Sequence, residues 1–454
     1  HVLEHIDRLI EIFNVCWPMY AAMPAVLKDA MLQAYEVCGW DLNSSTNHLG
    51  TGLYPTFKDL LAELVDVIDR SAYDQEVKSN YRGSLETRVH SLTNGLNGQI
   101  FSNAEIDNGV LFDQNTIIDL SRVGSTESKA LIMGILIMRL NEYRMTSSTS
   151  MNVPLHHVTV LEEAHNILRR TSTGQSEEGS NVAGKSVDMI ANSIAEMRTY
   201  GEGFIIADQS PSAVDISAIR NTNTKIIMRL PEEMDRRLAG KAAALRDDQL
   251  DEIAKLPKGV AVVYQNDWVE PVLCKIGKFN GEEKTYRMST WNQTIQNENS
   301  FHEELLKLLL KGRVSEQIDV NVDLIRRRLP QEDVSTKERI EILHWISEYE
   351  KTGKLEIWED NNFKQLSGVI SGLVDKKERV EHAVRETQEA DGLHAEALSK
   401  ELVEIARNYA PDMSGQICLT VCQCMMKTFS VENSTDLALY DMWYTHVEKG
   451  GKVQ

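Results

Sequence analysis

The spacing of apolar and polar residues divides the chain into three stretches. In residues 1–102, apolar side chains recur every three or four positions, which predicts a mostly helical insertion or support region. In residues 103–280, short β-branched runs alternate with helical stretches, which is typical of a mainly parallel sheet with crossover helices. Residues 281–454 lack strand signals and carry charged helical patterns, so we expect a separate all-α carboxyl-terminal region.

The middle stretch carries the strand signals, and its fold class is predicted to be α/β. The expected strands cover residues 158–161, 204–207, 225–230, 260–264 and 272–276, with two further short candidates in VLFDQNTIIDLS at residues 110–121. The expected helices cover residues 128–144, 185–200, 232–243 and 249–255. Connections of this kind bring the carboxyl ends of parallel strands to one edge of a sheet, where ligands bind.

Two acids and a glutamine follow two of these strands. Glu162 and Glu163 come directly after the strand at residues 158–161, and Gln209 follows the strand at residues 204–207. Nucleotide hydrolysis needs one acid for the water shell of Mg²⁺ and a second acid to orient the attacking water. A glutamine amide can contact that water or the γ-phosphate. Two acids alone also suit an ordinary strand end, but their order with Gln209 predicts a nucleotide site in which Gln209 faces Glu163.

An arginine near the end of the intervening helix is a further candidate. Arg198 could pair locally as a cation at a helix end, or reach the γ-phosphate of a neighbouring subunit as an arginine finger. Arg220 and Arg229 are rival candidates for the same role.

A phosphate-binding pattern also occurs in the loop after the acidic strand. GSNVAGKS at residues 179–186 matches G-x-x-x-x-G-K-[ST]. That mechanism needs a buried strand directly before the first glycine, so that backbone amides point at the phosphates. The preceding TSTGQSEE cannot form a core strand, and we therefore interpret the match as a flexible loop that caps a helix.

Charge and cysteine content narrow the classes of protein. A formal net charge of −20 over 454 residues repels nucleic acid, so phosphate binding must come from local basic patches. The run Arg326 to Arg328 is the densest basic one, and such runs usually form a solvated face. No stretch has the roughly 18 apolar residues of a membrane span, and we expect no membrane contact. Six cysteines without a disulfide framework predict a reducing cytoplasm, and the apolar run with Cys418, Cys422 and Cys424 predicts a buried helix.

At these motifs the sequence resembles the HerA branch of the HerA/FtsK hexameric ATPases. VTVLEEAHNIL is similar to the second nucleotide motif of that family, and EMRTYGEGFIIADQSP is similar to its arginine, Gly-x-Gly and strand-to-glutamine segment. IRNTNTKIIMRL and LPKGVAVVY are similar to its closing strands. The resemblance covers residues 1–280 and does not include the helical region that follows.

The resemblance implies a RecA-like core, ATP and Mg²⁺, a ring of six subunits, and translocation on double-stranded DNA, often beside a nuclease or another effector. By position, Glu162 stands at the magnesium-side acid and Glu163 at the catalytic glutamate. Arg198 stands at the arginine that acts on the neighbouring subunit, and Gln209 stands at the sensor. Arg220 is expected to contact the nucleotide.

The sequence departs from the family pattern at two points. Glu162 replaces the usual aspartate and is one methylene longer, which a water-mediated magnesium contact tolerates. The P-loop of the family precedes its helical segment, so we expect it before His1, and these residues alone are not expected to hold the phosphates of a nucleotide.

Other functions stay open from the sequence. A catalytically silent oligomeric scaffold that recruits an effector would keep the fold without turnover, and a secretion-coupling ATPase would share the core. A superfamily-two helicase is suggested by the EEAH motif, but it needs a second RecA-like lobe, for which the helical region gives no signal.

Overall fold

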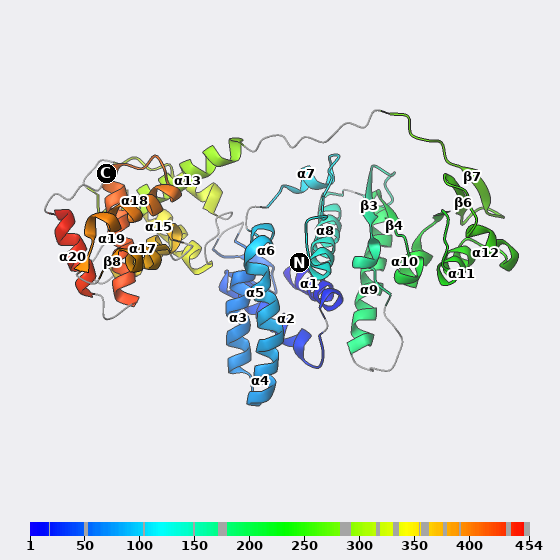
Figure 1. The fold of residues 1–454 in the computed structure, drawn as a ribbon, viewed down its shortest axis with the longest axis horizontal. Helices are drawn as coiled ribbons and strands as arrows, with labels where there is room; N and C mark the ends of the chain where they lie inside the picture. Colours follow the sequence, from blue (N-terminus) through cyan, green and yellow to red (C-terminus); the bar gives the residue numbers. More distant parts are fainter. Residues whose placement is uncertain are drawn as a thin grey trace.

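The computed structural model consists mostly of helices with small sheets (Figure 1). It describes residues 1–17, 19–49, 53–102, 105–148, 150–170, 179–281, 292–314, 318–329, 336–353, 355, 363–375, 379–389, 392–432 and 437–448. Within these ranges, no helix has both the length and the apolar character needed to cross a bilayer.

Helices form most of the first hundred residues, in agreement with their apolar spacing. They are α1 (Val2–Cys16), α2 (Met23–Val37), α3 (Phe57–Arg70), α4 (Gln75–Tyr81), the π-helical turn η1 (Arg82–Glu86), α5 (Thr87–Thr93) and α6 (Gly95–Ile100). A two-residue hairpin, β1 (Trp40–Asp41) with β2 (Thr46–Asn47), separates α2 from α3. A capping box begins α3, because the Thr56 hydroxyl accepts from the Asp59 amide and the Asp59 carboxylate accepts from the Thr56 amide.

The two strands predicted within residues 110–121 do not form. Residues 108–112 are instead the helix α7 (Asn108–Phe112), whose first amides donate to the Asp107 carboxylate. Ile117 and Ile118 lie in an irregular segment and are 87% and 45% exposed. An aspartate cap therefore decides the conformation at residue 108, and the following β-branched residues find no strand to pair with in the described chain.

The strand that carries the acids pairs in parallel with the strand that carries the glutamine. β3 (His157–Glu162) lies beside β4 (Glu202–Ala207), and Glu162 is opposite Ala207. The connection includes the 3₁₀ turn η2 (Ala164–Asn166), α9 (Gly179–Glu196) and the 3₁₀ turn η3 (Met197–Tyr200). Leu161 is buried against the long helix α8 (Thr126–Ser147), whereas the opposite face of the strand pair is exposed.

The later strands form a separate antiparallel sheet. β5 (Thr224–Ile227) pairs with β6 (Val260–Gln265), and β6 pairs with β7 (Val272–Lys275), in both cases antiparallel. The prediction of one mainly parallel sheet is therefore wrong for these three strands. For β6 and β7 the reason is their connection, which is too short to hold the crossover helix that parallel pairing needs. Figure 1 shows this sheet with α11 (Glu233–Ala242) and α12 (Asp247–Ile253) at the end of the molecule away from the carboxyl terminus.

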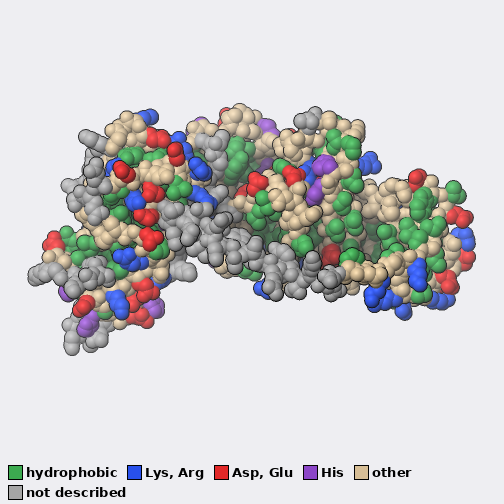
Figure 2. Space-filling model, turned by 90° about the horizontal axis from the view of Figure 1, so that it is seen from above, with side chains coloured by type: hydrophobic (Ala, Val, Ile, Leu, Met, Phe, Trp, Pro, Cys, Tyr) green, Lys and Arg blue, Asp and Glu red, His purple; other side chains and the backbone are tan. Residues whose placement is uncertain are grey.

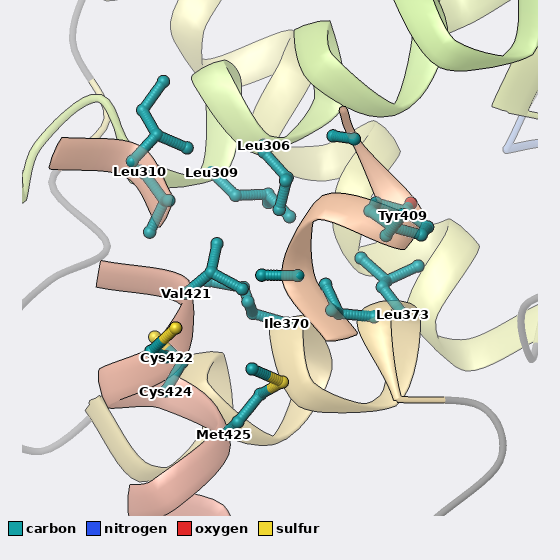
Figure 3. Packing of buried hydrophobic residues seen from close by; sticks show 14 of the residues in the cluster. Leu306, Leu309, Leu310, Ile370, Leu373, Tyr409, Val421, Cys422, Cys424 and Met425 are labelled. Atoms are coloured by element: carbon teal, nitrogen blue, oxygen red, sulfur yellow. The ribbon is translucent and has the colours of Figure 1, made fainter. Parts of the chain in front are cut away.

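The region after residue 291 is helical apart from a two-residue hairpin, β8 (Gln388–Glu389) with β9 (Gly392–Leu393). Its helices are α13 (Asn292–Leu310), α14 (Val322–Arg328), α15 (Thr336–Thr352), α16 (Phe363–Val374), α17 (Arg379–Thr387), α18 (Ala395–Tyr409), α19 (Gly415–Glu432) and α20 (Leu437–Glu448). Figure 3 shows their core, where Leu309 and Ile370 lie near Cys422 and Cys424. Burial raises the pKa of the Cys424 thiol to about 12, so this cysteine stays neutral and packs as an apolar side chain.

Buried apolar residues of the described chain gather in three clusters. One cluster joins α1–α5 to α8, β3 and α9, so the helices of the first hundred residues share a core with the strand that carries the acids. A second, small cluster lies between the β5–β7 sheet and α11 and α12. The third lies wholly within the helices from Phe301 to Trp443. The division of the chain into regions at residues 1–102, 103–280 and 281–454 stays a prediction.

Candidate functional site

The carboxyl edge of the parallel strand pair carries the predicted acids. Glu162 is the last residue of β3, and its side chain is exposed. Glu163 follows in a left-handed conformation, with φ 50° and ψ 47°. The Asn166 amide and the Asn166 side-chain nitrogen donate to the Glu163 carbonyl over 3.0 and 2.9 Å, which closes the 3₁₀ turn η2. This turn ends the strand and points the backbone away from the sheet edge.

Gln209 lies against Glu163, as the sequence predicts. The Gln209 side-chain nitrogen donates to the Glu163 carboxylate over 3.0 Å. Both side chains are exposed, and each follows the end of one strand of the parallel pair. A carboxylate and an amide are therefore held next to each other in reach of solvent, which is the arrangement needed to orient a water molecule.

Two residues that the sequence analysis did not single out complete the contact between the two turns. The Asp208 carboxylate accepts from the His165 backbone amide over 2.9 Å and from His165 Nδ1 over 2.8 Å. His165 Nδ1 also lies 3.6 Å from the Glu163 carboxylate. His165 lies in EEAH and Asp208 lies in ADQ, each within two residues of a predicted site residue. Because the two motifs follow neighbouring parallel strands, the sequence contained the signal that these two residues would lie close together.

The segment after β4 is fixed from two sides. Toward β3, the Arg170 amide donates to the Ala213 carbonyl over 2.8 Å and the Asp215 amide donates to the Leu168 carbonyl over 2.8 Å. Toward α11, the Ser212 amide donates to the buried Asp235 carboxylate over 2.8 Å. The glutamine that follows β4 is therefore connected both to the acidic turn and to the antiparallel sheet unit.

The candidate arginines lie apart from this pair. Arg198 is exposed in η3, which precedes β4, so the length of the strand separates it from Gln209. Arg220 is exposed in α10 (Ile216–Asn221), the helix that follows the Gln209 segment. Arg229 donates to the Ala254 carbonyl over 3.0 Å and supports the antiparallel sheet unit. Within the described residues, neither Arg198 nor Arg220 forms a hydrogen bond or ion pair with the acids, and their roles stay predictions.

The P-loop-like pattern is part of a helix. α9 begins at Gly179, so residues 179–186 form its first two turns, and the prediction of a capping loop is wrong for them. Ser186 is buried and donates to the Glu11 carboxylate of α1. A P-loop needs a glycine-rich loop between a strand and a helix, whereas residues 179–186 are already helical, so this segment does not form a P-loop. The preceding residues 171–178 lie outside the described chain.

The carboxylate oxygens at Glu162 and Glu163 suit a water-mediated contact with magnesium. Mg²⁺ prefers oxygen ligands, keeps several of its waters and is usually bound by one or two carboxylates together with substrate phosphates. Glu162 is an exposed carboxylate beside Glu163, and the described residues contain no cluster of three metal-binding side chains. The residues therefore fit a metal ion held through water and phosphate, and do not fit a closed protein cage.

A buried charged network holds the opposite edge of the strand pair. Glu202 of β4 accepts from Arg144 Nε over 2.9 Å, from His157 Nδ1 over 2.6 Å and from the Thr159 hydroxyl over 2.7 Å. Arg144 also donates to Asp113 over 2.7 Å. Hydrogen bonds from Arg144 and then Tyr143 lower the pKa of Asp113 below its ordinary value of 3.8. The network ties α8 to the start of both strands and so fixes where their other ends lie.

Basic side chains gather over the antiparallel sheet unit at one end of the molecule (Figure 2). The exposed basic residues of this part of the chain include Arg229, Arg237, Lys241, Arg246, Lys255 and Lys258. Several of them pair with acids of α11 and α12: Arg237 with Glu233, Lys241 with Asp247, Arg246 with Asp248 and Lys255 with Glu252. Arg326, from the dense basic run, pairs with Glu350. Local basic surface is therefore present, but it is partly neutralised.

Comparison with known proteins finds relatives that match part of the chain. No family model matches the chain. It is 23% identical over 230 residues to the DNA double-strand break repair helicase HerA of Sulfurisphaera tokodaii, a match that covers 50% of this chain and 43% of the relative. It is 25% identical over 182 residues to HerA of Sulfolobus acidocaldarius, covering 39% of this chain and 34% of the relative. The resemblance to HerA is confirmed.

The matches to HerA cover less than half of the length of these relatives. A solved structure, VirB4 of Thermoanaerobacter pseudethanolicus, is also similar, with 15% identity over 61% of this chain and 70% of that chain. Its TM-score is 0.45, which does not define the fold of this chain.

Proposed function

We propose that this chain is the part of a HerA-type ATPase that carries the water-orienting and sensing residues of an ATP site. The observation that supports this function best is the hydrogen bond between Gln209 and Glu163 at the carboxyl edge of two parallel strands. That edge is where α/β proteins bind their ligands. We propose a RecA-like core for the complete site, with the phosphates bound by residues other than those described.

The two side chains divide the work at the γ-phosphate. The Glu163 carboxylate accepts a hydrogen bond from the attacking water and orients it. The Gln209 amide can donate either to Glu163 or to a phosphate oxygen, so its partner differs between nucleotide states. Glu162 holds the water shell of Mg²⁺, which would neutralise charge on the phosphates.

The exposed arginines are proposed to act between subunits. Arg198 is separated from Glu163 of its own chain by the length of β4, so it is available to a neighbouring copy. A guanidinium that reaches the γ-phosphate of another subunit stabilises the charge of the transition state by about 10³- to 10⁵-fold in rate. This division requires a homo-oligomer, and we propose a hexameric ring in which Arg220 contacts the nucleotide of the same subunit.

The proposed substrate follows from the relatives. They are named DNA double-strand break repair helicases, and we therefore propose double-stranded DNA as the polymer on which the complete protein moves. The separate core of the region from Phe301 to Trp443 suits a partner-binding unit, and a nuclease or another effector is the proposed partner.

The test replaces Glu163 in the full-length protein. Glu163→Gln keeps the size of the side chain but removes the charge, so we expect DNA-stimulated ATP turnover to fall by about 10²-fold or more while ATP binding persists. Glu252→Gln is the matched control, because Glu252 is an exposed acid of α12 that pairs with Lys255, and its replacement should leave turnover unchanged. ATP turnover by Glu163→Gln at the wild-type rate would contradict the proposal.

The scaffold alternative predicts a different result. A silent scaffold would form the same oligomer and show no DNA-stimulated turnover in the wild-type protein, so Glu163→Gln would change nothing. Measurement of wild-type turnover therefore separates the two functions before any variant is made.

A further inference from the structure

Asp208 is the buried partner of an otherwise exposed site. Its side chain is 6% exposed, compared with 49% for Glu163 and 36% for His165. One carboxylate oxygen accepts from the His165 amide and from His165 Nδ1, and the other accepts from the Ser210 amide over 3.0 Å. Both oxygens are therefore used to hold backbone, one in the turn after β3 and one in the turn after β4.

These contacts connect the two turns that carry Glu163 and Gln209. Within the strands, Glu162 is opposite Ala207, so continued pairing would set Glu163 opposite Asp208. The left-handed conformation of Glu163 ends that register, and the Asp208 carboxylate instead binds the turn two residues further on. The next residue, Gln209, then reaches Glu163. The contact between glutamine and glutamate depends on where Asp208 holds the chain.

The same contacts orient His165. A carboxylate only accepts, so the imidazole nitrogen that faces it must carry the proton. The contact with Asp208 at 2.8 Å therefore assigns the proton to His165 Nδ1, and this nitrogen also lies 3.6 Å from the Glu163 carboxylate. A fixed imidazole beside Glu163 limits the positions that the carboxylate can adopt.

We propose that Asp208 and His165 are positioning residues of the hydrolytic site, which act by keeping Glu163 and Gln209 in contact. This inference rests on the proposed function, because it assigns a role toward Glu163. The positioning role needs no contact between these two residues and the phosphates. Asp208 and His165 should therefore affect the chemical step and not the binding of ATP. The positioning role also requires that the two residues act as one unit.

The experiment is a double-mutant cycle in the full-length protein, with ATP turnover measured as kcat and KM separately. Asp208→Ala is expected to lower kcat about 10- to 100-fold, the usual cost of losing a residue that orients a catalytic group. His165→Ala is expected to lower kcat by a similar factor. The kcat of the double variant is expected to be no lower than that of the less active single variant. KM for ATP should stay within about twofold of the wild type, because substrate capture is unchanged.

A conservative variant keeps the test valid if Asp208→Ala folds poorly. Asp208→Asn retains an oxygen that can accept from His165, so its kcat should lie between those of the wild type and Asp208→Ala. Asp215→Ala is the matched control, since the Asp215 side chain lies in the same segment, caps α10 and accepts from the Ser217 amide and hydroxyl. This control should keep wild-type kcat.

Parallel measurement of Glu163→Gln separates two failures. If Glu163→Gln loses turnover while Asp208→Ala and Asp208→Asn keep wild-type kcat, the positioning role is wrong and the proposed function stands. If Glu163→Gln keeps turnover, the proposed function itself fails. Losses that multiply in the double variant would show that Asp208 and His165 act separately, and would also overturn the inference.

Discussion

Glu163 holds a backbone conformation that costs a residue with a side chain about 1–2 kcal/mol. The surrounding hydrogen bonds offset this cost, because Asn166 donates twice to the Glu163 carbonyl and Gln209 donates to its carboxylate. Each such bond contributes about 0.5–1.5 kcal/mol. Strain that is held by several bonds at a strand end is typical of functional sites.

The proposed action of Arg198 between subunits can be tested by mixing variants. Arg198→Ala alone should lower turnover by about 10³-fold or more, and Glu163→Gln should lower it by about 10²-fold or more. Rings that contain both variants include interfaces with an intact Glu163 on one side and an intact Arg198 on the other. Mixed rings should therefore recover ATP turnover, measured after the two proteins are reassembled together.

Arg220→Ala is the control for this mixing experiment. If Arg220 contacts the nucleotide of its own subunit, Arg220→Ala and Glu163→Gln each disable the site of the subunit that carries them. A mixture of these two variants then contains no intact site and should recover no ATP turnover. No recovery in the Arg198→Ala mixture would contradict the action between subunits.

At the scale of elements, the network around Arg144 fixes the strand pair from its amino ends. Arg144 is 4% exposed at its side chain, and it donates to Glu202, Asp113 and the Phe112 carbonyl. Removal of one partner from such a network leaves another charge buried without compensation. The position of Glu163 and Gln209 at the far ends of these strands thus depends on α7 and α8.

The network predicts an acid-sensitive contribution to stability. The pKa of Asp113 is lower in the folded chain than its ordinary value of 3.8, so ionised Asp113 stabilises the fold above pH 3.8. This contribution is lost as the pH falls below 3.8 through the lowered pKa. Asp113→Asn should therefore be less stable than the wild type near neutral pH, and the difference should shrink as the pH falls below 3.8, as measured by urea unfolding. A difference that does not change with pH would contradict this assignment.

The elements that could be predicted were those decided by local pattern. The spacing of apolar residues indicated the helices, and the β-branched runs indicated β3 and β4 together with the edge that carries Glu163 and Gln209. Pairing directions were harder, because β6 and β7 form an antiparallel pair and strand propensity carries no direction. α7 was missed because the Asp107 cap outweighs the β-branched residues that follow it. Asp208 was missed because its role depends on a neighbour from another strand.

At the scale of the whole molecule, the described chain has three apolar clusters. The cluster from Phe301 to Trp443 shares no buried residue with the cluster that holds β3. Contact between the two regions includes Arg339, which lies 3.6 Å from the Asp59 carboxylate and 3.4 Å from the Tyr54 carbonyl. Regions with separate cores and polar contact between them are expected to unfold separately.

Thermal unfolding should therefore show more than one transition. Leu309 is fully buried in the carboxyl-terminal cluster, and Leu309→Ala should destabilise that region by about 2–5 kcal/mol. Only one calorimetric transition should shift to lower temperature, while the other transitions should stay in place. Leu64→Ala is the reciprocal control, because Leu64 is fully buried in the cluster that holds β3. A single transition that moves with either variant would show one cooperative unit.

Separate cores also affect how such a chain changes over evolutionary time. Substitutions can accumulate among the helices from Phe301 to Trp443 without any repacking around the strands that carry Glu163 and Gln209. Lineages are then free to exchange this helical region for another while inheriting the same strand-edge chemistry. Homologues should accordingly diverge fastest after residue 301, with different helical regions joined to one shared strand edge.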